Sequence, residues 1–116
     1  MDAETDIGPL ATAQIRDELA DQVRRSVSAG ARVAVGGAAL ERPGFYYAPT
    51  VLLDVPRTAA AALEETFGPV APVFRARDTA DALAFANDTP FGLGASVWTR
   101  DAVEAEHAVA SLECGM

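Results

Sequence analysis

The chain has 116 residues, of which 50% are hydrophobic and 22% charged, and its formal net charge is −8 at neutral pH. This length accommodates one domain or part of one, and the composition is typical of a packed globular protein rather than a disordered one. The acidic excess excludes nucleic acids and anionic membranes as expected partners, because binding to both depends on Lys and Arg that displace counterions.

Cysteine usage and hydropathy exclude further classes. The single cysteine, Cys114, allows neither an intramolecular disulfide nor a zinc cluster built from thiolates. The acidic N-terminus contains no apolar signal-peptide core, and no window approaches the roughly 18 consecutive apolar residues of a membrane span. We therefore expect a protein of the reducing cytoplasm, with no metal site and no membrane partner.

The first third of the chain is predicted to form a helix and then a strand. Thr12 can cap a helix whose apolar residues recur every four positions as far as Val27, and Gly30 provides a left-handed stop. Residues 31–35 alternate with period two, which indicates a short strand that ends at a Gly-Gly turn. A helix followed directly by a strand favours α/β layering.

The middle of the chain reads as a loop, two strands and a short helix. Residues 41–49 contain proline, glycine and three consecutive aromatic residues, which predicts a loop, and residues 50–53 form the strand that follows. The alanine-rich stretch 59–63 predicts a short helix. Residues 70–74 are β-prone in spite of Pro72, which indicates an edge strand or an irregular pairing.

The last third is predicted to contain two helices around a strand. Asp78 begins a helix that ends before Pro90, since a residue that precedes proline resists the helical region. Residues 93–98 are mostly apolar and predict a buried strand, after which Thr99 or Asp101 begins the final helix. The complete order, α, β, β, α, β, α, β, α, predicts an α/β fold with helices packed on a mostly parallel sheet.

The residue types by themselves indicate little chemistry. No Gly-rich phosphate loop follows a predicted strand, and no metal-ligand cluster is visible. We interpret His107 as a solvated histidine in the middle of a helix, and Cys114 as a buried, inert thiol with no neighbouring base. No catalytic residue is assigned.

Residues 64–70 (EETFGPV) are the most informative stretch. Adjacent carboxylates such as Glu64 and Glu65 at a helix end are often no more than a solvated face. A rigid aromatic turn follows them, however, and this favours a second interpretation. A carboxylate on the turn could accept hydrogen bonds from a vicinal diol such as a ribose, while the ring of Phe67 covers a flat heterocycle.

The same stretch resembles the EExFGPV signature of the aldehyde dehydrogenase superfamily. Further blocks resemble the family in the same order and with matching gaps: residues 6–10 (DIGPL), 30–37 (GARVAVGG), 44–52 (GFYYAPTVL), 87–93 (NDTPFGL) and 96–101 (SVWTRD). Together these blocks cover nearly the whole chain, which is therefore identified as a member of this family.

The resemblance implies an oxidoreductase that oxidises a small-molecule aldehyde to a carboxylic acid, with NAD or NADP as cofactor. In such enzymes a cysteine thiolate attacks the carbonyl, hydride passes to the nicotinamide, and water releases the thioester. The resemblance assigns Glu65 to the hydroxyls of the nicotinamide ribose and Phe67 to the nicotinamide end of the cofactor, and it assigns Glu64 no direct role. Residues 68–73 and 112–115 are similar to those of succinate-semialdehyde-type members.

The resemblance also implies that residues 1–116 are a partial catalytic domain, truncated at both ends relative to the family. The blocks with the nucleophilic cysteine, the water-activating glutamate and the Gly-containing cofactor turn lie upstream in the family, and Cys114 does not replace that cysteine. We thus expect the isolated chain to be inactive and the full-length parent to be a homodimer or homotetramer. The alternative is a stand-alone α/β binding or interaction module that associates through its open sheet edge.

Overall fold

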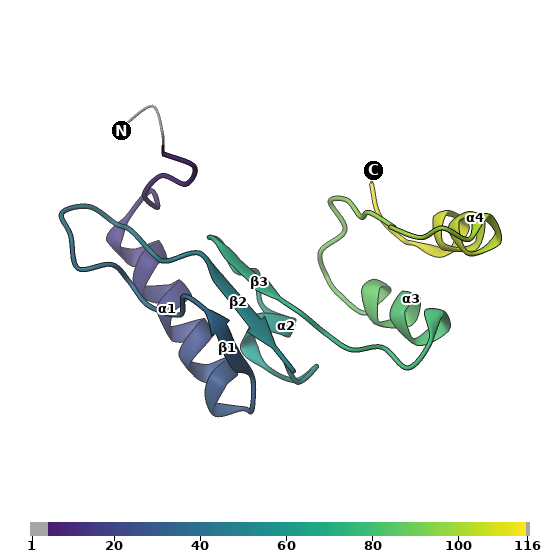
Figure 1. Cartoon of the computed structure of the whole chain (residues 1–116), viewed down its shortest axis with the longest axis horizontal. Helices are drawn as coiled ribbons and strands as arrows, with labels where there is room; N and C mark the ends of the chain where they lie inside the picture. Colours follow the sequence, from purple (N-terminus) through teal and green to yellow (C-terminus); the bar gives the residue numbers. More distant parts are fainter. Residues whose placement is uncertain (1–4, 116) are drawn as a thin grey trace. The chain divides into compact units, whose positions relative to one another are not determined.

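The computed structural model describes residues 5–115 and divides the chain into two compact units, with the boundary between Phe74 and Arg75 (Figure 1). Three strands and two helices belong to the first unit, and two helices to the second. None of the helices in residues 5–115 is long and apolar enough to cross a bilayer.

Helix α1 (Ala13–Ser28) begins and ends where the sequence predicts. The Thr12 hydroxyl accepts a hydrogen bond from the Ile15 amide at 3.1 Å, which satisfies one of the free N–H groups of the first turn. At the other end Gly30 adopts a left-handed φ of 118°, and the amides of Gly30 and Ala31 donate to the carbonyls of Val27 and Ser26. This pair of bonds is a Schellman motif, and it turns the chain directly into the first strand.

The sheet has three strands in the order β1-β2-β3. β1 (Arg32–Val35) pairs antiparallel with β2 (Thr50–Leu53), and β2 pairs parallel with β3 (Val70–Pro72). The predicted α/β fold is confirmed, but the sheet is mixed rather than mostly parallel. Pro72 lies on an edge strand, as predicted, where its missing N–H interrupts no second ladder.

Helix α2 (Ala60–Leu63) is the short helical part of the parallel crossover from β2 to β3. Its own N-cap, Ala59, provides no side-chain acceptor. Ser26 of α1 does so instead, because its Oγ accepts a hydrogen bond from the Ala61 amide at 2.9 Å and donates to the Gln22 carbonyl. A fully buried hydroxyl of one helix therefore caps the other.

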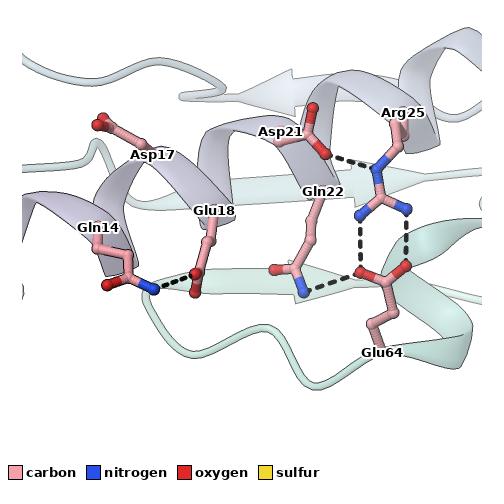
Figure 2. A pocket seen from close by; sticks show the side chains of 7 residues that line it. All are labelled: Gln14, Asp17, Glu18, Asp21, Gln22, Arg25 and Glu64. Carbon is pink, nitrogen blue, oxygen red and sulfur yellow. Dashed lines mark hydrogen bonds and ion pairs between the residues drawn. The ribbon is translucent and has the colours of Figure 1, made fainter.

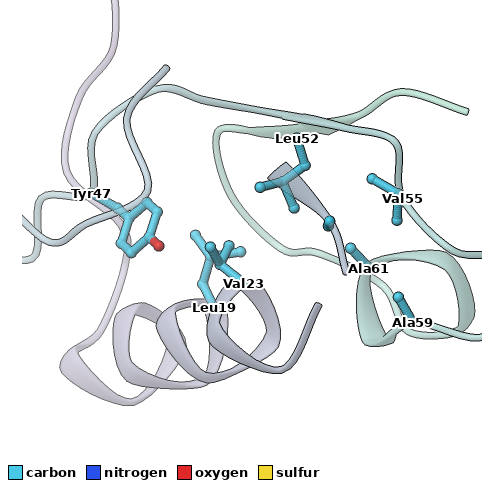
Figure 3. Close-up of a cluster of buried hydrophobic side chains, with 8 residues drawn as sticks. Leu19, Val23, Tyr47, Leu52, Val55, Ala59 and Ala61 are labelled. Atoms are coloured by element: carbon cyan, nitrogen blue, oxygen red, sulfur yellow. The ribbon is translucent and has the colours of Figure 1, made fainter. Parts of the chain in front are cut away.

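The core of the first unit lies between α1 and the connected β2–α2 segment (Figure 3). Leu19 and Leu52 are 1% and 0% exposed and are its largest fully buried apolar side chains. Tyr47 packs among them, with its hydroxyl directed toward Leu19 and Val23. Within residues 5–115 that hydroxyl has no hydrogen-bond partner, although Tyr47 is only 4% exposed.

The second unit contains helices α3 (Thr79–Asn87) and α4 (Ala102–Ser111). Asp78 and Asp101 are their N-caps, each accepting hydrogen bonds from amides of the following turn. Side-chain hydrogen bonds join the two helices: Thr79 donates to Glu104, and the Asn87 amide group donates to the Ser111 carbonyl at 2.8 Å.

The predicted buried strand at residues 93–98 is wrong. These residues are irregular, and Leu93 and Trp98 are 84% and 95% exposed. A strand needs a neighbour that accepts and donates its backbone hydrogen bonds, and the described chain places no such strand beside this segment. An apolar run identifies a segment that can be buried, but the partner decides whether it becomes a strand.

Candidate functional site

The stretch 64–70 leaves α2 and enters β3 as a tight turn. Glu64 is the C-cap of α2, with extended backbone angles, and its amide donates to the Ala60 carbonyl at 2.9 Å. The Gly68 amide then donates to the Thr66 carbonyl at 2.8 Å, which closes the turn. At its end the Thr50 amide of β2 donates to the Pro69 carbonyl at 2.8 Å, so the turn is attached directly to the sheet.

Helix α1 holds the beginning of the turn through polar side chains (Figure 2). The Arg25 guanidinium donates two hydrogen bonds to the Glu64 carboxylate, at 2.6 and 2.7 Å. The Gln22 amide group donates to the same carboxylate at 3.2 Å and to the Glu65 backbone carbonyl at 3.0 Å. Two side chains on one face of α1 therefore hold the Glu64 side chain and the Glu65 backbone.

Asp21 supports this arrangement from the other side of Arg25. Its carboxylate accepts a hydrogen bond from Arg25 Nε at 2.6 Å and also pairs with Arg24. The hydrogen bonds from Arg25 lower the pKa of the Glu64 carboxyl, and those from Arg25 and then Arg24 lower the pKa of Asp21. The Arg25 pKa rises in turn, chiefly because of Glu64. Both side chains of the central pair are about 40% exposed, so solvent screening limits what the pair adds to stability.

Gly68 anchors the second half of the turn by close packing. A Cβ atom at this position would lie 2.5 Å from Leu19 Cδ2 and 3.2 Å from Leu10 Cδ2. Leu19 is buried in the core, and its side chain occupies the space into which a side chain at position 68 would project. A larger residue at this position would require the Leu19 side chain to shift.

The two predicted site residues lie between these anchors. Glu65 is exposed, and among residues 5–115 its carboxylate makes no hydrogen bond or ion pair. Phe67 is 66% exposed, so most of its ring surface is accessible to a ligand. An available carboxylate and an available ring, one residue apart, fit a vicinal diol next to a flat heterocycle. Their role in cofactor binding stays a prediction.

An open groove of about 800 Å³ runs beside the beginning of the turn (Figure 2). Its walls come from one face of α1 and from the end of α2, and its only cation is the guanidinium that is paired with Glu64. The lining residues are Gln14, Asp17, Glu18, Asp21, Gln22, Arg25 and Glu64. Because carboxylates outnumber this cation, the groove does not suit an anionic group such as a phosphate.

His107 and Cys114, the histidine and the cysteine for which no chemistry is predicted, both lie in or near α4. His107 is exposed on α4, as predicted, and Glu104 is bonded to the hydroxyls of Thr79 and Thr99, which lower its pKa. Cys114 is half-buried rather than fully buried, beside an apolar cavity of about 340 Å³ that also contacts Val97. Within residues 5–115, no group of three or more His, Cys, Asp or Glu residues is arranged to hold a metal ion.

Sequence reasoning missed the function of Glu64 in the turn. Its partner, Arg25, is 39 positions away, and neither residue belongs to a pattern that would connect the two. The adjacent pair Glu64 and Glu65 thus divides into one carboxylate that is occupied within the fold and one that is available.

Comparison with known proteins identifies the family of the chain. The sequence matches the aldehyde dehydrogenase family over residues 1–116. It is 47% identical over 114 residues to the succinate-semialdehyde dehydrogenase [NADP(+)] of Mycobacterium avium, a match that covers 98% of this chain and 24% of that protein. The chain spans about a quarter of the length of the curated relatives that it matches.

Solved structures give the same result for the fold. Lactaldehyde dehydrogenase from Escherichia coli superposes with a TM-score of 0.95 and 40% identity, over 98% of this chain and 24% of that one. Succinic semialdehyde dehydrogenase from Streptococcus pyogenes, solved with NADP+ as the cofactor, superposes with a TM-score of 0.91 and 31% identity, over 100% of this chain and 26% of that one.

Proposed function

The chain belongs to the aldehyde dehydrogenase family, and from this premise we propose that it forms the part of an NAD(P)-dependent aldehyde dehydrogenase that contacts the nicotinamide end of the cofactor. The longer protein that contains this segment is called the parent enzyme below. A family match over the whole chain favours this function over a stand-alone binding module.

The anchored turn carries the proposal. Its backbone is held by Gln22 at Glu65 and by the close packing of Gly68, while the Glu65 carboxylate and the Phe67 ring are presented to solvent. NAD(P)+ would supply the hydride acceptor for the oxidation of an aldehyde. Glu65 would accept hydrogen bonds from the two ribose hydroxyls, and Phe67 would cover one side of the nicotinamide end and exclude water there.

Succinate semialdehyde is the proposed substrate. The relative from Mycobacterium avium, at 47% identity, supports this choice, as does the similarity of residues 68–73 and 112–115 to succinate-semialdehyde-type members. Lactaldehyde is the comparison substrate for the assay, because the chain is also similar to lactaldehyde dehydrogenase. The parent enzyme should have a higher kcat/KM for succinate semialdehyde than for lactaldehyde, and the reverse order would refute the substrate assignment.

The variant Glu65→Gln in the parent enzyme tests the cofactor site. Loss of the charged acceptor should raise the KM for NAD(P)+ by about tenfold, the size of one charge-assisted hydrogen bond, and should slow hydride transfer. Glu41→Gln is the matched control, since Glu41 is exposed in the loop that precedes β2. An unchanged rate together with unchanged cofactor affinity in Glu65→Gln would contradict the assignment.

We also infer a cytoplasmic, homodimeric or homotetrameric parent enzyme. The single cysteine, which has no second thiol for a disulfide within this sequence, supports a reducing compartment. Family membership supports the oligomer. Light scattering coupled to size-exclusion chromatography would measure the mass of the assembly, and a monomer would contradict it.

A further inference from the structure

We propose that Arg25 is a positioning residue of the cofactor site, which acts through Glu64 to hold Glu65 in its binding geometry. This inference rests on the proposed function of the turn. It adds a residue of α1, distant in sequence and without contact to the cofactor, to the set that determines cofactor affinity.

The path from Arg25 to the site is short and continuous. Two hydrogen bonds join the guanidinium to the Glu64 carboxylate, and the next peptide unit carries Glu65, whose carbonyl is held by Gln22. A planar peptide links consecutive residues rigidly, so a rotation of the Glu64 backbone moves Glu65 with it. The far end of the turn is held separately, because Gly68 packs against Leu19.

The guanidinium is itself fixed in orientation. Its Nε atom donates to Asp21 at 2.6 Å, while its two terminal nitrogens donate to Glu64 (Figure 2). Because the group is planar, three hydrogen bonds to two carboxylates determine its plane and therefore the direction of the Glu64 side chain. A lysine ammonium can neutralise Glu64 but cannot impose this direction.

Arg24 provides an internal comparison. It is adjacent in sequence, belongs to the same helix and also pairs with Asp21, but among residues 5–115 it makes no hydrogen bond or ion pair with Glu64. Its side chain is 69% exposed, against 43% for Arg25. A variant of Arg24 therefore removes one positive charge from the same turn of α1 and leaves the hydrogen bonds between Arg25 and Glu64 in place.

The experiment compares Arg25→Ala, Arg25→Lys and Arg24→Ala in the parent enzyme. We expect Arg25→Ala to raise the KM for NAD(P)+ about three- to tenfold with the KM for the aldehyde unchanged, Arg25→Lys to restore part of the loss, and Arg24→Ala to stay within about twofold of wild type. Assays are run at temperatures well below the unfolding midpoint of each variant. A general loss of folded protein would lower kcat for any substrate, and this precaution keeps it apart from the expected change in the KM for NAD(P)+.

A double-mutant cycle with Glu65→Gln separates positioning from general destabilisation. If Arg25 acts through Glu65, then Arg25→Ala should have little further effect on the cofactor KM in the Glu65→Gln background. If the two substitutions raise the cofactor KM by factors that multiply in the double variant, Arg25 does not act through Glu65. The same conclusion follows if the cofactor KM is normal in Arg25→Ala but raised in Glu65→Gln. Either result would overturn the positioning role of Arg25 and leave the proposed function of the turn in place. A normal cofactor KM in Glu65→Gln would instead overturn the proposed function of the turn.

Discussion

Gly68 lies against Leu19 with no space for a side chain between them. A Cβ on Gly68 would come within 2.5 Å of the Leu19 side chain, and Leu19 is 1% exposed, so any movement of Leu19 would have to displace neighbouring core side chains. The backbone of the candidate cofactor turn therefore uses the main helix of the first unit as its support. The same contact couples the conformation of the turn to the packing of the core.

The substitution Gly68→Ala should lower the free energy of unfolding by about 1–3 kcal/mol, because the new methyl group must displace the well-packed side chain of Leu19. Urea denaturation of the chain measures it. Gly92→Ala is the control, because its nearest contact would be the Glu113 carbonyl at 3.5 Å, an ordinary van der Waals distance. Equal unfolding midpoints for the two variants would show that the contact with Leu19 is easily relieved.

Ser26→Ala should destabilise the chain by about 1–3 kcal/mol, because the Ala61 amide at the start of α2 loses its acceptor inside the core. Ser28→Ala is a close control, since the Ser28 hydroxyl also donates to a carbonyl of α1 but is exposed, and it should change stability by about 0.5 kcal/mol or less. Thermal and urea unfolding give both values, and similar losses in the two variants would contradict the capping role of Ser26.

Tyr47→Phe should stabilise the chain by about 1 kcal/mol, because it removes a buried hydroxyl that has no partner within residues 5–115. Burial also raises the Tyr47 pKa. The folded chain thus keeps this proton after the unfolded chain has lost it, so stability declines as the pH rises above about 10, the ordinary tyrosine pKa. Unfolding at alkaline pH should show this decline in wild type and in Tyr46→Phe but a smaller one in Tyr47→Phe.

Stability should also fall in acid because of the pair between Arg25 and Glu64. The hydrogen bonds from Arg25 lower the Glu64 pKa in the folded chain. The contribution is present above the unfolded pKa of about 4 and is lost as the pH falls through the lower folded value. Urea midpoints between neutral and acidic pH should therefore decrease less in Arg25→Ala than in wild type. Arg42→Ala, which removes a cation stacked on Tyr46, should keep the wild-type slope.

The isolated 116-residue chain should form no NAD(P)H from NAD(P)+ and an aldehyde. The family resemblance assigns only cofactor contacts, Glu65 and Phe67, to this segment, and it assigns the nucleophilic role to a cysteine other than Cys114. Absorbance at the reduced-nicotinamide band follows the reaction, with the parent enzyme as the positive control. Aldehyde-dependent turnover that disappears in Cys114→Ser would identify Cys114 as a nucleophile and contradict this prediction.

The sequence by itself determined the features that depend on short-range interactions. The caps at Thr12, Asp78 and Asp101 each involve amides within three residues, and the Schellman end at Gly30 is likewise local. The strands at residues 32–35 and 50–53 and the edge position of Pro72 could also be predicted. The family could be inferred as well, because its motifs are read in linear order.

Only the tertiary structure decided the features that depend on a distant partner. Residues 93–98 have the composition of a strand but are irregular, since backbone hydrogen bonds in a sheet come from a neighbouring strand that no local pattern specifies. Glu64 and Glu65 are adjacent and chemically identical, and Arg25, 39 positions from Glu64, makes one structural and leaves the other available. The EETFGPV motif identifies the family. The contacts between α1 and the turn determine that the Glu64 carboxylate is paired within the fold and that the Glu65 carboxylate is exposed.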